Sequence, residues 1–255
     1  MSYNFKNTLV RKPGKSISKA ISSMGLVPKY EIVIKEHENY IKTLKNSGVN
    51  VISLTPLEDF PDSIFVEDPA LTFLDFCIIL RPGADTRFGE REVFESEAKE
   101  HFEKVFSLEK GRVEGGDVLR INNHFIIGLS DRTNKYGAED LAKKLIYLGA
   151  TVEISKTPKG ILHFKSECSL LDDETIFLTR RMSETKFFSK NYRTVEVPIG
   201  EEIAANSLRV NENLIIPRGF NKTQELLSKN YNIKLLDVNE ISKVDAGLSC
   251  MSIRW

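Results

Sequence analysis

Five residues with side chains suited to catalysis recur along the chain at a nearly constant interval. They lie 47, 49, 43 and 44 residues apart, and each precedes an apolar, hairpin-like stretch: Glu67, Glu114, His163, Asn206 and Cys250. A near-regular period of this size predicts a ring or array of similar units. Units arranged around an axis would bring these positions together. Carboxylates, an imidazole and a thiol in one place are the components of a cysteine-based active site.

Two acidic motifs contain the first candidates. Glu67 and Asp68 stand side by side between hydrophobic residues and Pro69, whereas Glu114 and Asp117 flank a pair of glycines. Adjacent acids usually belong to a solvated turn, but glycines allow the backbone to approach another group closely. The equivalent location of the two motifs in successive units favours a functional interpretation.

One histidine and one cysteine both fall on the repeat and have neighbouring residues suited to a role in catalysis. His163 stands among apolar residues at the expected start of a strand, where a hydrogen-bonded core histidine is the common alternative. Cys77 lies inside the apolar stretch 73–80 and is expected to pack in the core, and Cys168, which has no glycine-rich setting, is expected to be structural. Cys250 follows Gly247-Leu248-Ser249, a loop able to expose a reactive thiol.

Two arginines form a second matched pair. Arg87 and Arg132 each lie just after the hairpin of their unit, in RPGADTR and SDRTN respectively. Arginines in such places often cap helices or face solvent. Two positioned guanidinium groups can also clamp a carboxylate, because each presents a planar fork of N–H donors.

The elements between these positions are expected to repeat in the order hairpin, helix and single strand. Apolar runs around short polar turns predict four hairpins, at 70–80, 118–129, 163–178 and 207–216. Helices are expected at 36–46, 90–105, 138–148, 184–191 and 223–229. Single strands are expected at 49–54, 151–154, 194–197 and 233–238.

The two ends of the chain are expected to complete the ring. The strand after Cys250 needs a partner, and residues 8–11 can supply one. Joining the first and last strands would remove exposed sheet edges. Because no linker or low-complexity segment interrupts the chain, residues 1–255 are expected to form one domain of five ββαβ units.

Composition argues against several classes of protein. Lys and Arg total 36 and so do Asp and Glu, and a net charge of zero does not suit a generic nucleic-acid or anionic-membrane surface. No secretory segment or membrane-spanning run is expected, since no apolar stretch approaches the roughly 18 residues of a spanning helix. Three distant cysteines without a CxxC pair argue against a disulfide framework or a structural zinc site and favour a cytoplasmic setting.

Seven motifs resemble, in order and spacing, those of the dimethylarginine dimethylaminohydrolase family, particularly its bacterial members. They are FPDSIFVEDP, RPGADTR, EGGDVL, GLSDRTN, LHFKS, IAAN and KVDAGLSCMS. The resemblance begins at Val10-Arg11-Lys12-Pro13 and continues to the last residues of the chain. It implies an α/β fold, the fivefold pseudo-symmetric β/α-propeller of guanidine-modifying enzymes, which agrees with the period found independently.

The resemblance also implies the catalytic residues. Cys250 would be the nucleophile and His163 the general acid and base. Glu114, with a part in catalysis, and Asp68 would bind the substrate guanidinium, with Glu67 beside them. No metal ion or organic cofactor is implied.

The remaining implied contacts hold the amino-acid end of the substrate. Asp62 would bind the α-ammonium group, and Arg87 and Arg132 the carboxylate. Residues 18–22, which include Ile21, would form a mobile lid that contacts the substrate.

The implied reaction hydrolyses dimethylarginine or monomethylarginine to citrulline and a methylamine. Carboxylates would fix the plane of the guanidinium and direct its carbon at the thiolate, which the bound cation or a nearby imidazolium would favour. Attack by Cys250 would give a tetrahedral adduct, and His163 would protonate the departing amine. Water activated by neutral His163 would then release citrulline from an S-alkylthiouronium on Cys250.

Related reactions and one different class of protein stay open. An arginine deiminase generally carries an additional helical domain, for which this chain has no room, and an amidinotransferase would pass the amidino group to another amine. A non-catalytic ring, as in the ribosome anti-association factor, has no need for a matched Cys, His and acid set. A hyper-reactive Cys250 would indicate an enzyme. The expected partner is a small-molecule substrate, and the expected state is a monomer or homodimer.

Overall fold

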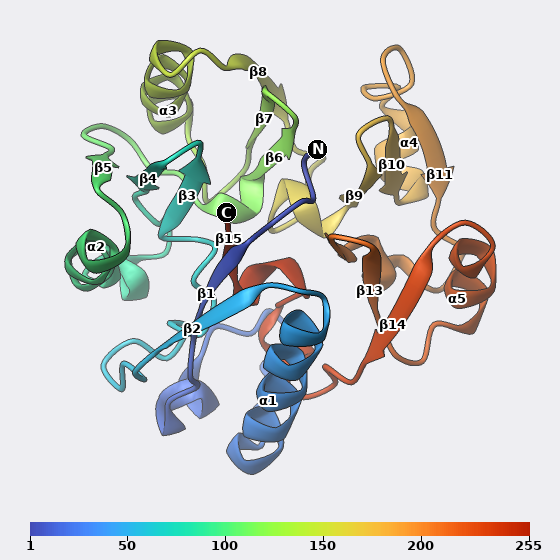
Figure 1. Cartoon of the computed structure of the whole chain (residues 1–255), viewed down its shortest axis with the longest axis horizontal. Helices are drawn as coiled ribbons and strands as arrows, with labels where there is room; N and C mark the ends of the chain where they lie inside the picture. The colour runs from blue at the N-terminus through green and yellow to red at the C-terminus, as the bar shows by residue number, and fades with distance from the viewer.

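Five small sheets contain all the strands of the protein. The computed structural model describes the whole chain, residues 1–255, and its fifteen strands form five sheets of three. Figure 1 shows the sheets arranged around a common centre, with the helices on the periphery. The mixed α/β fold therefore repeats one small unit five times.

Four of the five sheets join a hairpin to a third strand that lies parallel to the second strand of the hairpin. In one unit, β3 (Ala70–Phe73) pairs antiparallel with β4 (Phe76–Ile79), and β5 (Lys104–Ser107) lies parallel to β4. The connection from β4 to β5 contains α2 (Glu90–His101). This order confirms the predicted ββαβ unit.

The next three units have the same order of elements. The second contains β6 (Val118–Ile121), β7 (His124–Leu129), α3 (Lys135–Tyr147) and β8 (Thr151–Lys156). The third contains β9 (Cys168–Asp172), β10 (Thr175–Leu178), α4 (Arg180–Glu184) and β11 (Arg193–Glu196). The fourth contains β12 (Leu208–Val210), β13 (Asn213–Pro217), α5 (Asn221–Ser228) and β14 (Asn232–Leu236).

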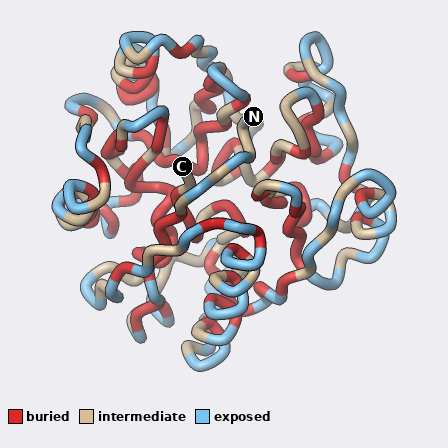
Figure 2. Tube along the Cα trace, in the orientation of Figure 1, coloured by how far each residue is buried: buried red, intermediate tan, exposed pale blue.

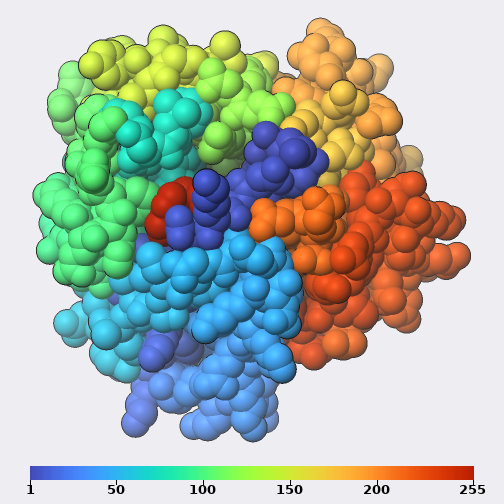
Figure 3. Space-filling model, in the orientation of Figure 1, coloured from blue at the N-terminus to red at the C-terminus, as the bar shows by residue number.

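The two ends of the chain share the fifth sheet. β15 (Ile253–Arg254) pairs antiparallel with β1 (Asn7–Arg11), which pairs in parallel with β2 (Asn50–Leu54) after α1 (Tyr30–Asn46). The predicted partnership between the strand after Cys250 and the N-terminal segment is confirmed. Figure 3 shows both ends of the chain near the centre of the same face.

The helix predicted at 184–191 is wrong. α4 covers Arg180–Glu184 instead, and the side chain of Thr179 caps it by accepting a hydrogen bond from the backbone N–H of Met182. Lys186 adopts a left-handed backbone with φ of 55°, which ends the helix. The residues beyond this point, Phe187 and Phe188 among them, form turns and bends.

Other predicted boundaries also differ. The helix expected at 36–46 begins earlier, at Tyr30. The helix expected at 90–105 ends at His101, because the chain then becomes extended and enters β5. His163 was expected to begin a strand, but one turn of 3₁₀ helix, Phe164–Ser166, separates it from β9. His163 therefore lies on a loop at the entrance of the strand.

Burial is concentrated in the sheets and on the inner sides of the helices (Figure 2). The core consists of five clusters, the largest with 17 buried residues. Cys77 and Cys168 are fully buried in two of these clusters, as predicted, and all three cysteines are free. None of the helices is long and apolar enough to cross a membrane. The packed sheets hold the loops that enter their first strands.

Candidate active site

The loops that lead into the first strand of each sheet bring the predicted catalytic side chains together. Glu114, His163 and Cys250 line one small cavity of about 30 Å³, together with Asp68 and Arg132. A larger adjoining cavity of about 880 Å³ shares His163, Arg132 and Cys250. Candidate catalytic residues that lie more than 40 positions apart in the sequence therefore line the same cavity.

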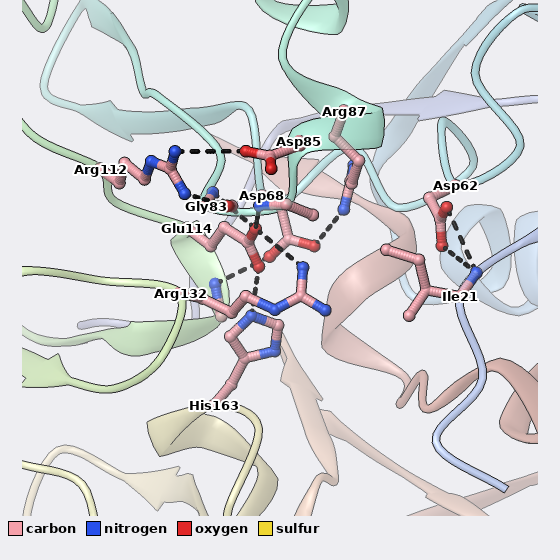
Figure 4. Close-up of polar contacts among 12 residues, drawn as sticks. Ile21, Asp62, Asp68, Gly83, Asp85, Arg87, Arg112, Glu114, Arg132 and His163 are labelled. Carbon is pink, nitrogen blue, oxygen red and sulfur yellow. Dashed lines mark hydrogen bonds and ion pairs between the residues drawn. The ribbon is translucent and has the colours of Figure 1, made fainter.

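His163 forms a close ion pair with Glu114 in this cavity. Its Nε2 lies 2.6 Å from Glu114 Oε2, and Glu114 Oε1 accepts a hydrogen bond from the backbone N–H of Gly83 at 2.8 Å (Figure 4). Burial disfavours the imidazolium, but the hydrogen bond to Glu114 and neighbouring carboxylates outweigh it and raise the pKa of His163 to about 9. His163 is therefore protonated at neutral pH.

The EGGD motif explains how this histidine is positioned. A Cβ on Gly116 would lie 2.7 Å from Cγ of His163, so only glycine leaves room for the ring. Asp117 accepts hydrogen bonds from the backbone N–H of Phe164 at 2.8 Å and from the hydroxyl of Ser130 at 2.6 Å. The predicted close approach of the backbone at this glycine pair is confirmed.

Cys250 lies in one turn of 3₁₀ helix, Ser249–Met251. Its C=O accepts a hydrogen bond from the backbone N–H of Glu67 at 3.1 Å, and its Sγ accepts one from Gly247 at 3.4 Å. Burial and the negative charges of Glu67 and Asp68 raise the pKa of the thiol to about 12. These surroundings favour the neutral thiol, and the reactivity of Cys250 stays a prediction.

A buried charge cluster braces the turn that carries Cys250. Glu67 forms an ion pair with Lys165, whose Nζ lies 2.6 Å from Oε1, and accepts hydrogen bonds from Arg254 Nη2 at 2.9 Å and Ser249 Oγ at 2.9 Å. Burial disfavours its charge, but Lys165 and Arg254 lower the pKa of Glu67 below its ordinary value. Glu67 lines a different cavity from Asp68, so its direct contact with a substrate stays a prediction.

Three members of this cluster were not predicted as functional residues from the sequence. Lys165 lies two residues after His163 in LHFKS, and Ser249 and Arg254 lie on either side of Cys250, so proximity was the available signal. Asn206 completes the brace: its Nδ2 donates to the C=O of Lys165, and its Oδ1 accepts from the N–H of Ser249, both at 3.1 Å.

Arg87 is largely engaged within the protein. Its guanidinium donates to Glu90 twice, to Asp68 at 2.6 Å and to the C=O of Phe65 at 2.9 Å. One N–H of Nη1 is left, because a guanidinium has five. Arg87 thus orients Asp68, and its contact with a substrate carboxylate stays a prediction.

Arg132 is more open than Arg87. Its side chain is 18% exposed and lines both cavities, and its Nη1 lies 3.5 Å from Glu114 Oε1. This is the one side-chain hydrogen bond of Arg132 within the protein, so most of its N–H donors are unused. It is therefore the better placed of the two arginines to bind an anionic group.

The predicted lid segment closes one side of the small cavity. Ile21 donates its backbone N–H to Asp62 at 3.1 Å (Figure 4), and Ser22 donates its hydroxyl to the C=O of Lys243 at 2.7 Å. Burial raises the pKa of Asp62, which a cationic ligand would reverse. The segment is thereby tied to the loop that leads to Cys250, and its mobility stays a prediction.

The site also contains a set of atoms able to bind a metal ion. Ligand atoms of Asp68, Glu114 and His163 all lie within 4.8 Å of one another. Carboxylate and imidazole ligands suit divalent transition metals. In this structure the same groups form ion pairs with each other or with Arg87.

A cysteine, an ion-paired histidine and carboxylates around one cavity define a class: cysteine enzymes that act on cationic groups such as guanidinium. A family model described as "N,N dimethylarginine dimethylhydrolase, eukaryotic" matches residues 26–253. An N(G),N(G)-dimethylarginine dimethylaminohydrolase from Pseudomonas aeruginosa is 35% identical, over 98% of this chain and 100% of its own. The chain belongs to the dimethylarginine dimethylaminohydrolase family.

Solved structures agree with this assignment. A cysteine-to-serine variant of the P. aeruginosa protein, complexed with citrulline, has a TM-score of 0.94 at 34% identity and covers 99% of this chain and 100% of its own. A histidine-to-glycine variant, as an adduct with S-methyl-L-thiocitrulline, also has a TM-score of 0.94 at 34% identity, with 98% and 100% covered. The N-terminal domain of ArgZ, a cyanobacterial arginine dihydrolase, shares the fold at 16% identity, with a TM-score of 0.83 over 100% of this chain and 97% of its own.

Proposed function

We propose that this chain hydrolyses Nω-methylated arginine to citrulline and a methylamine through a covalent intermediate on Cys250. One observation carries the proposal: His163, ion-paired with Glu114, lines the same acidic cavity as the Cys250 thiol. A protonated histidine can act as the acid for a departing amine. The acidic cavity suits a cationic substrate.

The proposed scaffold is a fivefold pseudo-symmetric β/α-propeller formed by residues 1–255 as a single domain. Its support is that equivalent residues from β3, β6, β9, β12 and β15 line one common cavity. This arrangement requires the first strand of every sheet to face a shared axis. We also expect a cytoplasmic protein that works as a monomer or homodimer without nucleic-acid or membrane partners.

The bound guanidinium itself is the proposed trigger for ionisation of the thiol. In the empty site, burial and the charges of Glu67 and Asp68 raise the pKa of Cys250. A cation held by Asp68 and Glu114 would compensate these charges and lower that pKa. Thiolate then forms only when its target is in place.

The proposed chemistry requires two roles of His163. Cys250 Sγ attacks the guanidinium carbon to form a tetrahedral adduct. The bond from carbon to the methylated nitrogen breaks as His163 gives that nitrogen a proton, through the ring nitrogen that does not contact Glu114. Neutral His163 then takes a proton from water, whose oxygen adds to the S-alkylthiouronium. The C–S bond breaks, citrulline leaves, and the cysteine is regenerated.

The amino-acid end of the substrate lies toward the lid in this proposal. Arg132, with the remaining N–H of Arg87, binds the α-carboxylate. Asp62 binds the α-ammonium group beside the backbone of Ile21. Both contacts recognise features shared by arginine and its methylated forms, so they set affinity rather than discriminate between them.

A panel of guanidino compounds assayed for both citrulline and released amine tests the proposal. We expect kcat/KM for dimethylarginine to exceed that for arginine by roughly 10- to 100-fold, because a mismatched hydrogen-bond arrangement costs about 1–3 kcal/mol. Equal or better use of arginine would indicate a deiminase. A product that retains the amidino group on an added amine would indicate an amidinotransferase, and binding without turnover would indicate a non-catalytic protein.

A further inference from the structure

A second cavity lies on the axis of the ring, beyond the turn that carries Cys250. Its volume is about 130 Å³, and it is lined by three residues from each inner strand region: 70–72, 118–120, 168–170, 207–209 and 252–254. Ser2, Tyr3 and Phe5 also line it. Figures 1 and 3 show that this N-terminal segment crosses the centre of the ring. The space is large enough for several water molecules or one small ion.

The charges that line this axial cavity do not balance. Four are cationic and one is anionic: Arg120, Lys165, Arg209, Arg254 and Glu67. Lys165 and Arg254 both pair with Glu67. The guanidinium groups of Arg120 and Arg209 form no ion pair. Burial lowers the pKa of Arg120, and the charge of Asp173 partly opposes that shift. An excess of positive charge around a cavity favours an anionic ligand.

Arg120 and Arg209 are held alike on different units. The Nε of each donates to a C=O two residues further on, Asn122 at 2.9 Å and Asn211 at 2.8 Å. Both guanidinium groups also lie over aromatic rings, those of Phe73 and Phe125 for Arg120 and those of Tyr3 and Tyr231 for Arg209. These contacts fix the positions of both guanidinium groups and leave most of their N–H donors unused.

One of those donors is buried without a partner. Nη1 of Arg209 is shielded from solvent and has no hydrogen-bond acceptor within the protein. Buried polar groups are almost always hydrogen-bonded, and a charged donor has the greatest need of an acceptor. Because Nη1 has almost no accessible surface, the remaining N–H donors of Arg209 and those of Arg120 are the ones available to a ligand in the cavity.

We propose that the axial cavity binds a small oxyanion, of the phosphate or carboxylate type, at Arg209 and Arg120. Oxyanions accept several hydrogen bonds at once, which matches the fork of donors on each guanidinium. The site is separate from the proposed catalytic cavity and requires no turnover. It can therefore be tested whether or not the proposed function holds.

An anion bound at this site is expected to affect the position of Cys250 through Arg254. That residue lines the axial cavity, donates to Glu67, and donates Nη1 to the C=O of Ser249 at 3.1 Å. An oxyanion that attracts Arg254 would compete with Glu67 for it. The turn that carries Cys250 would then lose part of its support.

Calorimetric titration with inorganic phosphate, at constant ionic strength maintained with chloride, tests the site. We expect saturable one-to-one binding that weakens about tenfold or more in Arg209→Gln and in Arg120→Gln, since each removes charge-assisted hydrogen bonds. Arg193→Gln is the matched control, because Arg193 is exposed on β11 and pairs with Glu174 at the surface. It should bind phosphate as the unmodified protein does. An unsaturable response, or equal affinity in all variants, would overturn the proposal.

Arg132→Gln separates the axial cavity from the proposed catalytic site. Arg132→Gln should bind phosphate as the unmodified protein does. If Arg132→Gln lost phosphate binding while Arg209→Gln retained it, the anion would lie beside Cys250 and the axial site would be refuted. Crystals of the unmodified protein soaked in selenate provide a second test that does not depend on the folding of a variant. The anomalous peak should lie between Arg209 and Arg120. A peak elsewhere only, or none, would contradict the proposal.

Discussion

The two ends of the axis are made by the same five strands yet have opposite chemistry. At one end, residues that precede the strands supply carboxylates, a histidine and a thiol. At the other, residues within the strands supply Arg120, Arg209 and Arg254. The repeated sheets hold both sets of side chains near the axis. The charge at each end is determined by which residue types occupy those positions, so the repeat sets location and the individual residues set chemistry.

A single ion cluster separates the two ends. Lys165 lines both the axial cavity and the large cavity beside Cys250, while Glu67 and Arg254 line only the axial one. Breaking a buried ion pair typically costs about 3–5 kcal/mol, because one charge is left uncompensated. The cluster therefore holds the ends apart and also sets the electrostatic environment of the thiol.

The largest expected effect comes from the thiol at the acidic end. Cys250→Ser should reduce turnover by at least about 10⁴-fold, because a hydroxyl is far less ionised than a thiol and loss of a nucleophile has effects of this size. Steady-state assays of citrulline formation, with circular dichroism to check the fold, measure it. Cys77→Ala is the control: it should lower stability and leave activity per folded molecule unchanged, since Cys77 is a core residue. Substantial turnover by the serine variant would exclude Cys250 as nucleophile.

His163→Ala is expected to have the next largest effect. Steady-state turnover should fall by roughly 10²- to 10⁴-fold, the usual contribution of a general acid and base. For substrates with good leaving groups, the covalent adduct should accumulate, and mass spectrometry of acid-quenched protein should detect it on Cys250. His124→Ala, which removes a partly exposed histidine bonded to Thr151, should behave as the unmodified protein does. Full activity of His163→Ala would refute the assignment.

The pair of His163 and Glu114 also predicts how stability depends on pH. The folded-state pKa of His163 is about 9 against 6.5 when unfolded, so the folded protein binds the extra proton between these values. Its stabilisation is complete below pH 6.5 and lost as pH rises through 9, which amounts to about 3 kcal/mol. Urea unfolding across this range measures the decline. Glu114→Gln should flatten it, and a free energy of unfolding that rises with pH would contradict the pairing.

The repeat and its closure were predictable because they depend on local signals. Polar turns such as Asn122-Asn123 mark hairpins whatever surrounds them, and the structure has a turn there between β6 and β7. The period of the candidate residues then indicated which side chains meet. The prediction of a helix at 184–191 was wrong because Lys186 adopts a left-handed backbone, which no signal in the sequence marks.

The ion pairs between buried side chains could not be predicted from the sequence. Arg87 could be recognised as a carboxylate ligand, but nothing in the sequence revealed that Asp68 and Glu90 already occupy most of its donors. The same holds for Lys165 and Arg254, which acquire their roles only through a carboxylate from another unit. Pairing of buried charges depends on three-dimensional distances that residue spacing does not encode.

The smallest effect on turnover should come from the ion cluster of Glu67, Lys165 and Arg254. A substitution there tests whether the axial end of the ring supports the catalytic end. Glu67→Gln keeps the shape of the side chain and removes its charge. The pKa of the Cys250 thiol should fall, because the charge of Glu67 helps to raise it. Yet kcat should also fall, by about tenfold, since Lys165 and Arg254 lose their partner and the nucleophile is held less well; misplacement by about 1 Å can cost 10²-fold. The pH dependence of thiolate absorbance and steady-state kinetics measure the two changes, and Glu174→Gln serves as an exposed control. A lower thiol pKa with faster turnover would mean that Glu67 acts only through its charge, and that the brace between the ends does not position Cys250.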